Sequence, residues 1–582
     1  MKALFTTLVL LVIMALMLIP GQSYAQSGTL VVYANSSFSI DQIIANDQTS
    51  GVQNHSVYKL VSTDTTYLLE ATITLGQSVQ IVGVPDSKTG QLPCIQADVL
   101  NDGSIPGIFF TLTGQGTTVQ LDSLYLLGIA PNNSNNTSAG QGVQISADSI
   151  KLWVDNCVFD EMSQFDIAFS SNWNKIYIEN SKFRNGIDVA SAYYVPELLR
   201  SLNGVGAWST DTIVIKYNTL LGVAMGPVVT TGITHYFDFS HNDVVLTSKG
   251  PFWSEQVVNA KLDNNIFYNT YGVGETHTEY IGGWDEIKPP RIPSIFYFAT
   301  LDSTKAALLL GHAVNGPLDY AAAEALRKVE VKDNVYFWSS GLTSFWNNWN
   351  DTNSTLYDSI YTPVFMNSQS DSMFLSINSS IWPGFVSSGN VNVDPGFGTS
   401  ISSTALTPGS DTTYGVGFLA YIAAVRNGTG TTQSYSYKRT EVGTSASWMP
   451  TWPLPESADL KYSNTSLVST DGLPVGDPYW FTHEITGIKT VTFIPHTYSL
   501  SQNYPNPFNP TTQINFSLEK ASNVSLAVYN VLGQKVANVV NQFMQAGSYI
   551  ENFNATKLAS GIYFYRIEAG DFVSVKKMVL MK

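Results

Sequence analysis

The sequence predicts an all-β chain, in which a right-handed parallel β-helix (solenoid) is followed by a small antiparallel immunoglobulin-like β-sandwich. Two observations lead to this prediction: a six-residue pattern recurs through the middle of the chain, and the last part carries strand patterns of a different spacing. Composition agrees, because only 13% of the 582 residues are charged, well below the usual share of a globular protein. Polar turns between short apolar strands fit an extracellular β protein.

The recurring pattern reads apolar, any, polar, small or Asn, any, apolar. Its fourth positions are separated by 24, 37, 24, 23 and 69 residues, and 69 is three times 23. A fixed period in the low twenties, with strand-like alternation, indicates a stacked β-solenoid rather than a helical repeat. A β-sandwich array with accidental spacing is the alternative. The six copies are Val154–Phe159, Ile178–Phe183, Ile215–Leu220, Phe239–Val244, Leu262–Phe267 and Val331–Tyr336.

Stacking of these copies predicts columns of equivalent residues, because neighbouring strands lie about 4.8 Å apart. The first and last positions of the copies are then two inner apolar columns. An Asn at the turn tolerates left-handed dihedral angles and can hydrogen-bond the equivalent Asn of the next coil. The ladder positions are Cys157, Ser181, Asn218, Asn242, Asn265 and Asn334.

The N-terminus has the pattern of a secretion signal over residues 1–25. Lys2 precedes an apolar run from Ala3 to Ile19, and Ser23-Tyr24-Ala25 provides small residues at the −3 and −1 positions of a cleavage site. An uncleaved membrane anchor is the alternative, since the run is barely long enough to span a bilayer. We therefore expect an exported protein.

The β-helix is predicted over residues 26–487, and we call this part of the chain the passenger. Thr29–Tyr33 is its first strand, and Ser39 can cap a short helix over the following residues that covers the first coil. Insertions fall near residues 187–206 and 272–317, where loops leave the solenoid. Two further helices are expected at Leu318–Arg327 and 417–426, Trp448–Trp480 is interpreted as a C-terminal cover, and 488–497 as a linker.

The tail, residues 498–582, is predicted to be a separate antiparallel sandwich because its strand patterns alternate and are closely spaced. The expected strands are Gln513–Leu518, Val524–Asn530, Gly547–Asn552, Gly561–Ala569 and Asp571–Leu580.

Short motifs in this tail resemble the C-terminal sorting domain (type A) of the type IX, or Por, secretion system. The opening motif is Tyr504-Pro505-Asn506-Pro507-Phe508-Asn509-Pro510, and Val528–Gly533, Leu558–Phe564 (with Gly561) and the basic Lys576-Lys577 follow in the family's order. The resemblance implies export by the general pathway and then across the outer membrane of a Bacteroidota-like bacterium. It implies the type IX translocon as a partner and a tail that is often cleaved or exchanged for a surface anchor.

The solenoid resembles the pectate-lyase-like superfamily of right-handed β-helices, which includes polysaccharide lyases, glycoside hydrolases and adhesins. The most similar coil is Trp153–Phe159, with Asp166-Ile167 and Ile176–Ile178. Asn156 stands where the family has His, and the family's Asp-Gly is absent. No arginine matches the catalytic-arginine motif, and Arg200 and Arg291 are the only loop candidates. The resemblance therefore implies the fold more strongly than catalysis.

Charge excludes one class of partner. With a net charge of −16, the chain has no basic stripe to neutralise phosphates, so nucleic acid is not expected to bind. An anionic ligand is also disfavoured unless cations are locally clustered. The best cluster of cations and acids is Asp160, Lys182 and Arg184, our candidate catalytic residues. The column containing Asp160 and Arg184 turns apolar along the axis, so a covering loop is the alternative.

Two further candidate sites come from the repeat. Asp155 and Glu179 are predicted to stack about 5 Å apart, as a carboxylate pair for Ca²⁺. Lys216 follows in the same column, which favours a solvated charge ladder instead. Trp346 and Trp349 are candidates for stacking on sugar rings, with burial under the cover as the alternative. No other cofactor is evident.

The chain has two cysteines, Cys94 and Cys157. They could form a disulfide in an exported protein, although a small buried thiol also fits the ladder position.

Two functions are open at this level. The first is an extracellular or cell-surface protein that binds carbohydrate or acts in adhesion without catalysis. The second is a polysaccharide lyase or glycoside hydrolase. A lyase needs a base for the C5 proton and cations that stabilise the resulting anion. The missing catalytic-arginine motif favours the first function.

Overall fold

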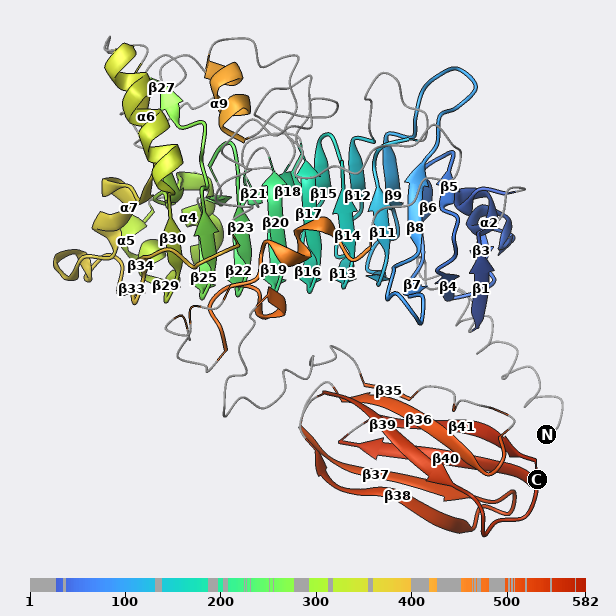
Figure 1. Cartoon of the computed structure of the whole chain (residues 1–582). Helices are drawn as coiled ribbons and strands as arrows, with labels where there is room; N and C mark the ends of the chain where they lie inside the picture. The colour runs from blue at the N-terminus through green and yellow to red at the C-terminus, as the bar shows by residue number, and fades with distance from the viewer. Residues whose placement is uncertain are drawn as a thin grey trace. The chain divides into compact units, whose positions relative to one another are not determined.

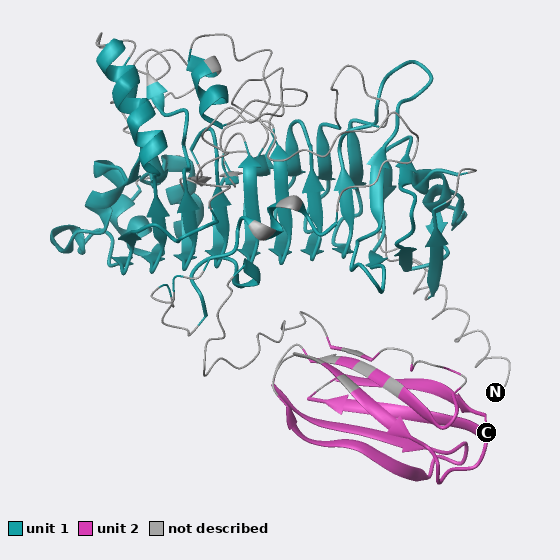
Figure 2. Cartoon of the chain, in the orientation of Figure 1, with its two compact units in different colours: residues 1–483 teal, residues 484–582 magenta. Residues whose placement is uncertain are grey.

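The chain forms two compact units, residues 1–483 and 484–582 (Figure 2), in a computed structural model. The first unit is a right-handed parallel β-helix and the second an antiparallel sandwich, as the sequence predicts. The predicted signal and linker lie outside the described residues. The structure describes residues 28–34, 38–130, 139–186, 197–202, 208–223, 226, 228–230, 232–250, 252–254, 256–276, 293–311, 318–353, 359–398, 418–426, 452–462, 464, 467, 473–480, 498–500, 503, 506, 508–518, 521–544, 547–570 and 572–581.

Three parallel sheets form the walls of the β-helix (Figure 1), and each complete coil adds one strand to each sheet, while the coils at the ends lack some of these strands. The eleven-stranded sheet contains β1 (Thr29–Tyr33), β4 (Val57–Val61), β7 (Val79–Val84), β10 (Thr118–Asp122), β13 (Lys151–Asp155), β16 (Lys175–Glu179), β19 (Thr210–Lys216), β22 (Thr234–Ser240), β25 (Val257–Asp263), β29 (Lys328–Lys332) and β33 (Gly384–Ser388). The ten-stranded sheet contains β5 (Tyr67–Leu69), β8 (Cys94–Ala97), β11 (Tyr125–Leu127), β14 (Val158–Asp160), β17 (Lys182–Gly186), β20 (Thr219–Val223), β23 (Asp243–Val245), β26 (Ile266–Tyr268), β30 (Val335–Phe337) and β34 (Val391–Asn392). The seven-stranded sheet contains β6 (Ile73–Leu75), β9 (Ile108–Leu112), β12 (Gln141–Ile145), β15 (Phe165–Phe169), β18 (Glu197–Ser201), β21 (Val228–Thr230) and β24 (Phe252–Ser254). Shorter pairs join β2 (Gln48–Thr49) to β3 (Val52–Gln53), β27 (Glu275–Thr276) to β31 (Ile360–Tyr361), and β28 (Ser294–Phe296) to β32 (Val364–Met366).

The predicted polar ladder forms at the turn between the eleven- and ten-stranded sheets. The Asn242 backbone N–H and side-chain Nδ2 both donate to Asn265 Oδ1 at 3.0 Å, and Asn218 donates to Asn242 in the same way. The ladder continues one coil further than predicted, because Asn334 donates to Asn390 Oδ1. These bonds satisfy backbone groups that the buried turn would otherwise leave unpaired.

One detail of the ladder prediction is wrong. The left-handed residue is the one before each ladder position, not the ladder Asn itself. The φ angle is positive at Asn156, Asn180, Tyr217, His241, Asn264, Asp333 and Gly389.

The two predicted apolar columns are also present, and they fill the interior of the β-helix. Ile178 pairs with Val154 on one side and Ile215 on the other, and Phe159 pairs with Phe183 in the next sheet. The Phe159 and Phe183 rings stack at 5.1 Å between centroids. All five side chains are at most 1% exposed, so the columns form one continuous core.

Replacing Asn242 with alanine tests the ladder. The Asn218 N–H and the Ile215 carbonyl, both bonded to the Asn242 side chain, would be left buried without partners. We expect a loss of about 2–4 kcal/mol in the free energy of unfolding, measured by urea denaturation. Asn259→Ala, at an exposed strand position, is the matched control and should cost less than about 0.5 kcal/mol. Equal losses for the two variants would show that the hydrogen bonds of the ladder do not stabilise the fold.

Helices cover the ends and one side of the β-helix (Figure 1). The predicted first helix forms as α2, and its Ile40 and Ile44 are buried against the first coils. Ser39 precedes it but makes no side-chain cap bond, which differs from the prediction. The helices are α2 (Ile40–Asn46), α4 (Ser303–Leu310), α5 (Tyr320–Ala325), α6 (Ser340–Thr352), α7 (Ser368–Met373) and α9 (Phe418–Arg426), with 3-10 turns η1 (Ser376–Asn378), η3 (Pro455–Ala458) and η4 (Pro478–Trp480).

The helix expected at Leu318–Arg327 is shorter, because α5 ends before Arg327. The guanidinium of Arg327 instead binds the Val257 and Ala299 carbonyls and the Glu324 carboxylate. The next residue, Lys328, begins β29, so the chain must leave the helix here.

Cys94 and Cys157 are both buried and free. Cys94 packs in a cluster on the outer side of the ten-stranded sheet, whereas Cys157 belongs to the inner core. A disulfide between them is therefore absent, and burial raises the pKa of both thiols.

The second unit is a sandwich of a three-stranded and a four-stranded antiparallel sheet. The predicted strands are present with ends shifted by up to two residues. The two-residue strand β35 and the edge strand β38, whose alternation is weak, were not predicted. The strands are β35 (Ser499–Leu500), β36 (Thr511–Leu518) and β39 (Gly547–Asn554) in one sheet, and β37 (Ser522–Tyr529), β38 (Lys535–Met544), β40 (Gly561–Ala569) and β41 (Phe572–Leu580) in the other.

Candidate functional site

Two of the three candidate catalytic residues meet in the ten-stranded sheet. Asp160 ends β14 and Arg184 lies opposite it on β17, with Arg184 Nη1 and Asp160 Oδ2 separated by 2.8 Å. Their side chains are 4% and 3% exposed. A pair this deeply buried is an internal ion pair and not an open site.

Further polar groups complete this internal cluster. The Tyr125 hydroxyl donates to Asp160 Oδ2, and Asn185 Nδ2 donates to Asp160 Oδ1 at 3.0 Å. Arg184 Nε lies 3.0 Å from Oε1 of Glu456, which comes from η3 far along the chain. Burial raises the pKa of Glu456 and the Arg184 charge opposes that shift. One guanidinium therefore holds two buried carboxyl groups.

The segment that contributes Glu456 is the predicted cover, and it lies on the outer side of the ten-stranded sheet. Leu454 packs against Tyr125 and Val158. At the other end, Trp480 Nε1 donates to Thr219 Oγ1 at 2.6 Å, and Thr219 Oγ1 donates to Asp477 at 2.8 Å. The alternative of a covering loop therefore describes this column correctly at Asp160 and Arg184.

Lys182, the third candidate, also contacts the cover. Its Nζ lies 4.2 Å from the centre of the Tyr479 ring and 5.4 Å from that of Trp480. Burial lowers the pKa of Lys182, while the Asp477 carboxylate opposes this. Asp160 and Arg184 are buried beneath the cover, and Lys182 is partly buried against it, so a catalytic role for the three together would require the cover to leave.

Of the two tryptophans proposed for sugar stacking, Trp346 is buried and Trp349 is partly buried. Both lie on α6, a helix that the sequence reading missed although Leu342, Trp346 and Trp349 recur at helical spacing. Trp346 is 3% exposed, and its Nε1 donates to the Gly272 carbonyl at 2.9 Å. Trp349 is partly buried against the same core. The alternative that these rings are buried describes Trp346 correctly.

Asp155 and Glu179 do pair in register on the eleven-stranded sheet. Asp155 Oδ1 accepts a hydrogen bond from Asn180 Nδ2 at 2.7 Å, so one carboxylate oxygen is already used. Among the described residues there is no group of three or more His, Cys, Asp or Glu side chains arranged for a metal. Ca²⁺ prefers six to eight oxygens, and binding here stays a prediction that would need water or ligand oxygens.

A group of aromatic and basic side chains lies on the outer side of the eleven-stranded sheet and was not found from the sequence. We call it the aromatic–basic patch. Lys151 pairs with Lys175, and Trp153 pairs with Tyr177, whose ring stacks on it at 3.8 Å. The signal was present, because these pairs sit 24 residues apart in the repeat. The patch comprises Lys151, Trp153, Trp173, Lys175, Tyr177 and Tyr236.

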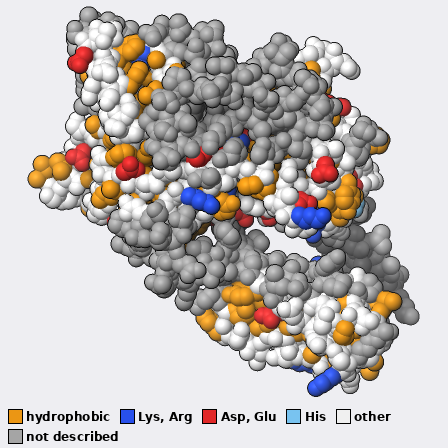
Figure 3. Space-filling model, viewed as in Figure 1, with side chains coloured by type: hydrophobic (Ala, Val, Ile, Leu, Met, Phe, Trp, Pro, Cys, Tyr) orange, Lys and Arg blue, Asp and Glu red, His pale blue; other side chains and the backbone are white. Residues whose placement is uncertain are grey.

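Its outermost members face solvent. Trp173, in the turn before β16, is 46% exposed and Tyr236 is 40% exposed, while Lys175 is 47% exposed and pairs with Asp211 at 3.6 Å. Lys151 Nζ lies 4.6 Å from the centre of the Trp153 ring. On the face shown in Figure 3, charges of both signs are scattered over the described surface.

A second group missed from the sequence is the pair Glu197 and Arg200 on β18. The Glu197 side chain is fully buried and its Oε1 lies 2.8 Å from Arg200 Nη1, whereas Arg200 is one-third exposed. Burial raises the pKa of Glu197 to about 8, and the Arg200 charge opposes the shift. Arg200 was named only as a loop candidate; it is a strand residue, and nothing local in the sequence marks Glu197 as buried.

This shift predicts a pH dependence. The pKa of Glu197 is raised from 4.5 in the unfolded chain to about 8, so its contribution is present below about pH 4.5 and is lost as pH rises through 8. We expect thermal unfolding of the first unit to shift to lower temperature between about pH 5 and pH 9. The difference should be on the order of a few kcal/mol, and Glu197→Gln should remove it. An unchanged pH profile in that variant would contradict the assignment.

The opening motif of the tail has a structural role in the second unit. Asn506 Oδ1 accepts from the Val579 N–H at 2.8 Å, and Phe508 pairs its backbone with Val579 and Met581. The start of the sandwich therefore holds its last strand, which carries Lys576 and Lys577. Asn509 and Pro510 follow, Gly533 occupies a turn with φ of 76°, and Gly561 begins β40. Tyr504, Pro505 and Pro507 lie outside the described residues.

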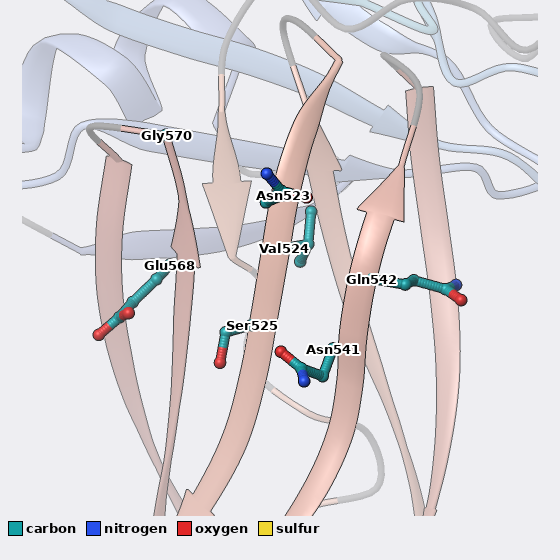
Figure 4. A pocket seen from close by; sticks show the side chains of 7 residues that line it. All are labelled: Asn523, Val524, Ser525, Asn541, Gln542, Glu568 and Gly570. Atoms are coloured by element: carbon teal, nitrogen blue, oxygen red, sulfur yellow. The ribbon is translucent and has the colours of Figure 1, made fainter.

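The second unit also has a shallow pocket of about 560 Å³. Figure 4 shows the side chains around it, from β37, β38 and β40. They are mostly polar, with Glu568 as the charged member, and Glu568 pairs with Arg566 at 2.7 Å. The lining residues are Asn523, Val524, Ser525, Asn541, Gln542, Glu568 and Gly570.

Comparison with known families supports the reading of the tail. Residues 502–581 match the secretion system C-terminal sorting domain, the Por secretion tail. Comparisons with curated proteins and with solved structures gave no match for the chain. The tail is thus a type IX sorting domain, which implies interaction with the type IX machinery and export to the cell surface or outside. Among the described residues, no helix has the length and apolar character needed to cross a membrane.

Proposed function

We propose that the β-helix binds an extracellular polysaccharide at the cell surface or beyond. The sorting domain supports delivery to that compartment. The passenger then needs an exposed surface that suits a polymer, and a β-helix repeats the same wall every coil, at about 4.8 Å. The aromatic–basic patch is the part of this wall whose chemistry fits a sugar chain.

The observation that carries the proposal is the composition of the patch. Lys151 and Lys175 lie directly side by side in neighbouring strands, where like charges repel. Such a pair is unexpected in a chain of net charge −16. Asp211, 3.6 Å from Lys175, offsets part of the repulsion, and an acidic ligand would relieve more of it. The exposed Trp173 and Tyr236 rings beside it supply the flat apolar surfaces on which sugar rings stack. A polysaccharide with carboxylate groups therefore fits best.

Binding without cleavage is the version that the geometry favours. The acid and base groups expected to be catalytic, Asp160 and Arg184, are paired with each other and lie under the cover. The carboxylates that contact the patch are already paired: Asp211 lies 3.6 Å from Lys175, and Asp238 lies 2.7 Å from Lys216 and accepts from the Tyr236 hydroxyl. Neither is placed as a general acid or base toward a bound sugar. We therefore propose a binding protein and not a lyase or hydrolase.

The test is equilibrium binding of the purified chain to a panel of acidic and neutral polysaccharides, with ultraviolet absorbance followed for unsaturated products. We expect binding to an acidic polymer and no product. The combined Lys151→Ala and Lys175→Ala variant should bind about tenfold more weakly, since two charged contacts are lost. Trp173→Ala should also weaken binding.

Lys328→Ala is the matched control, because Lys328 is an exposed lysine in the same sheet, paired with Asn259. It should leave the affinity unchanged. Equal losses for Lys328→Ala and the double variant would show that only general charge matters. Unsaturated product from the wild-type chain would replace the proposal with a lyase.

A further inference from the structure

Glu197 and Arg200 lie on a different wall from the aromatic–basic patch. Strand β18, which carries both, runs between β15 and β21 in the seven-stranded sheet (Figure 1). Arg200 Nη1 lies 2.8 Å from Glu197 Oε1, yet the Glu197 side chain is 0% exposed and the Arg200 side chain is 33% exposed. The guanidinium therefore spans from a buried carboxyl group to the solvent.

Glu197 uses only part of its bonding capacity. Its Oε1 contacts Arg200, while Oε2 has no hydrogen-bond partner among the described residues. An ionised carboxylate in such a place is costly, because burial removes water and only one oxygen is compensated. Among the described groups, Arg200 is the one charged side chain that acts on Glu197, and the carboxyl pKa of about 8 follows from this balance.

A protonated Glu197 leaves the Arg200 charge without a counter-ion among the described residues. Arg200 also lies over the Phe165 ring, with its guanidinium carbon 5.9 Å from the ring centre, so an aromatic face supports the cation at the surface. A guanidinium held in this way presents paired N–H donors that match the two oxygens of a carboxylate.

We infer that Arg200 binds a carboxylate group of an acidic polysaccharide, and that a proton on Glu197 makes its charge available. In the protonated state the Arg200 charge attracts the ligand. In the ionised state Glu197 satisfies Arg200 internally and the ligand competes with it. This site rests on the proposed polysaccharide binding but lies on a different sheet from the aromatic–basic patch. Experiments can therefore exclude one of the two sites without excluding the other.

The experiment is calorimetric titration of the full chain with a short oligogalacturonate and, as the neutral probe, its methyl ester. Titrations at about pH 6 and about pH 9 lie on either side of the Glu197 pKa of about 8, while the ligand carboxylates stay ionised at both pH values. We expect the acidic oligomer to bind about tenfold more tightly at the lower pH. The methyl ester should show no such difference.

Two variants test whether Glu197 and Arg200 cause the pH difference in affinity. Glu197→Gln, which cannot ionise, should bind the acidic oligomer at both pH values with the wild-type affinity of the lower pH. Arg200→Gln should bind about tenfold more weakly at the lower pH and lose the pH difference. The double variant of Lys151 and Lys175 is the control: it should lose binding at the aromatic–basic patch and keep the pH difference.

The inference is overturned if Glu197→Gln retains the wild-type pH difference, or if Arg200→Gln binds the acidic oligomer as well as the wild type. If Glu197→Gln does not fold, Arg200→Gln decides, since its side chain is one-third exposed. A wild-type chain that binds the oligomer equally at both pH values overturns this site alone and leaves the aromatic–basic patch standing. A wild-type chain that binds no acidic oligomer overturns both.

Discussion

Replacing Arg184 with methionine will destabilise the first unit by about 3–5 kcal/mol. The guanidinium contacts Asp160 at 2.8 Å and Glu456 at 3.0 Å, and all three side chains are at most 4% exposed. Removing the cation leaves two carboxyl groups buried without their partner. Urea denaturation of wild type and variant measures the difference, and the variant should also release the cover to proteases at lower urea.

Two comparisons separate this effect from simple loss of charge. Lys175→Met removes an exposed cation whose partner Asp211 is also exposed, and it should cost less than about 1 kcal/mol. The triple variant Asp160→Asn, Arg184→Met and Glu456→Gln removes all three charges together and should recover most of the loss. If Arg184→Met costs no more than Lys175→Met, the buried cluster does not hold the cover.

Deleting residues 498–582 will abolish delivery to the cell surface. The deleted residues include the whole match to the sorting domain, and they belong to a unit separate from the β-helix, so the passenger keeps its own core. We expect the truncated protein to accumulate in the periplasm of the native host. Protease treatment of intact cells, followed by fractionation and immunoblotting, measures the surface share.

A point variant gives a finer version of this experiment. Asn506→Ala removes the acceptor for the Val579 N–H and should loosen the last strand, which lowers but does not abolish export. Asn541→Ala, in the pocket of Figure 4 and away from that contact, is the matched control. Truncated protein at the surface in wild-type amount would contradict the assigned role of the tail.

Much of the fold could be predicted because its stabilising contacts are periodic. A residue such as Ile178 packs on residues one repeat away in each direction, so the period in the sequence maps directly onto contacts in space. The same logic located the ladder through Asn218, Asn242 and Asn265. It misassigned the left-handed position, since hydrogen bonding and φ are divided between adjacent residues and a consensus does not separate them.

The candidate site was harder to predict because its contacts are not periodic. Asp160 and Arg184 pair within the repeat, but the residue that completes their cluster, Glu456, is more than 250 positions away and belongs to no repeat. The sequence likewise does not indicate that Glu197 is buried, since its burial depends on tertiary packing around β18. By contrast, the lysine pair of the patch recurs at the repeat spacing. It was not predicted because the sequence analysis compared the apolar positions of the repeat and not the positions before them.

Hydrogen–deuterium exchange of the chain with and without the acidic polysaccharides of the panel tests the central claim most directly. The account predicts that a bound polymer slows exchange in Lys151–Asp155 and Lys175–Glu179, the strands of the aromatic–basic patch. Exchange in the covered strand Lys182–Gly186 should stay unchanged. Failure of every polymer to protect the patch strands, or protection confined to the covered strand, would contradict it.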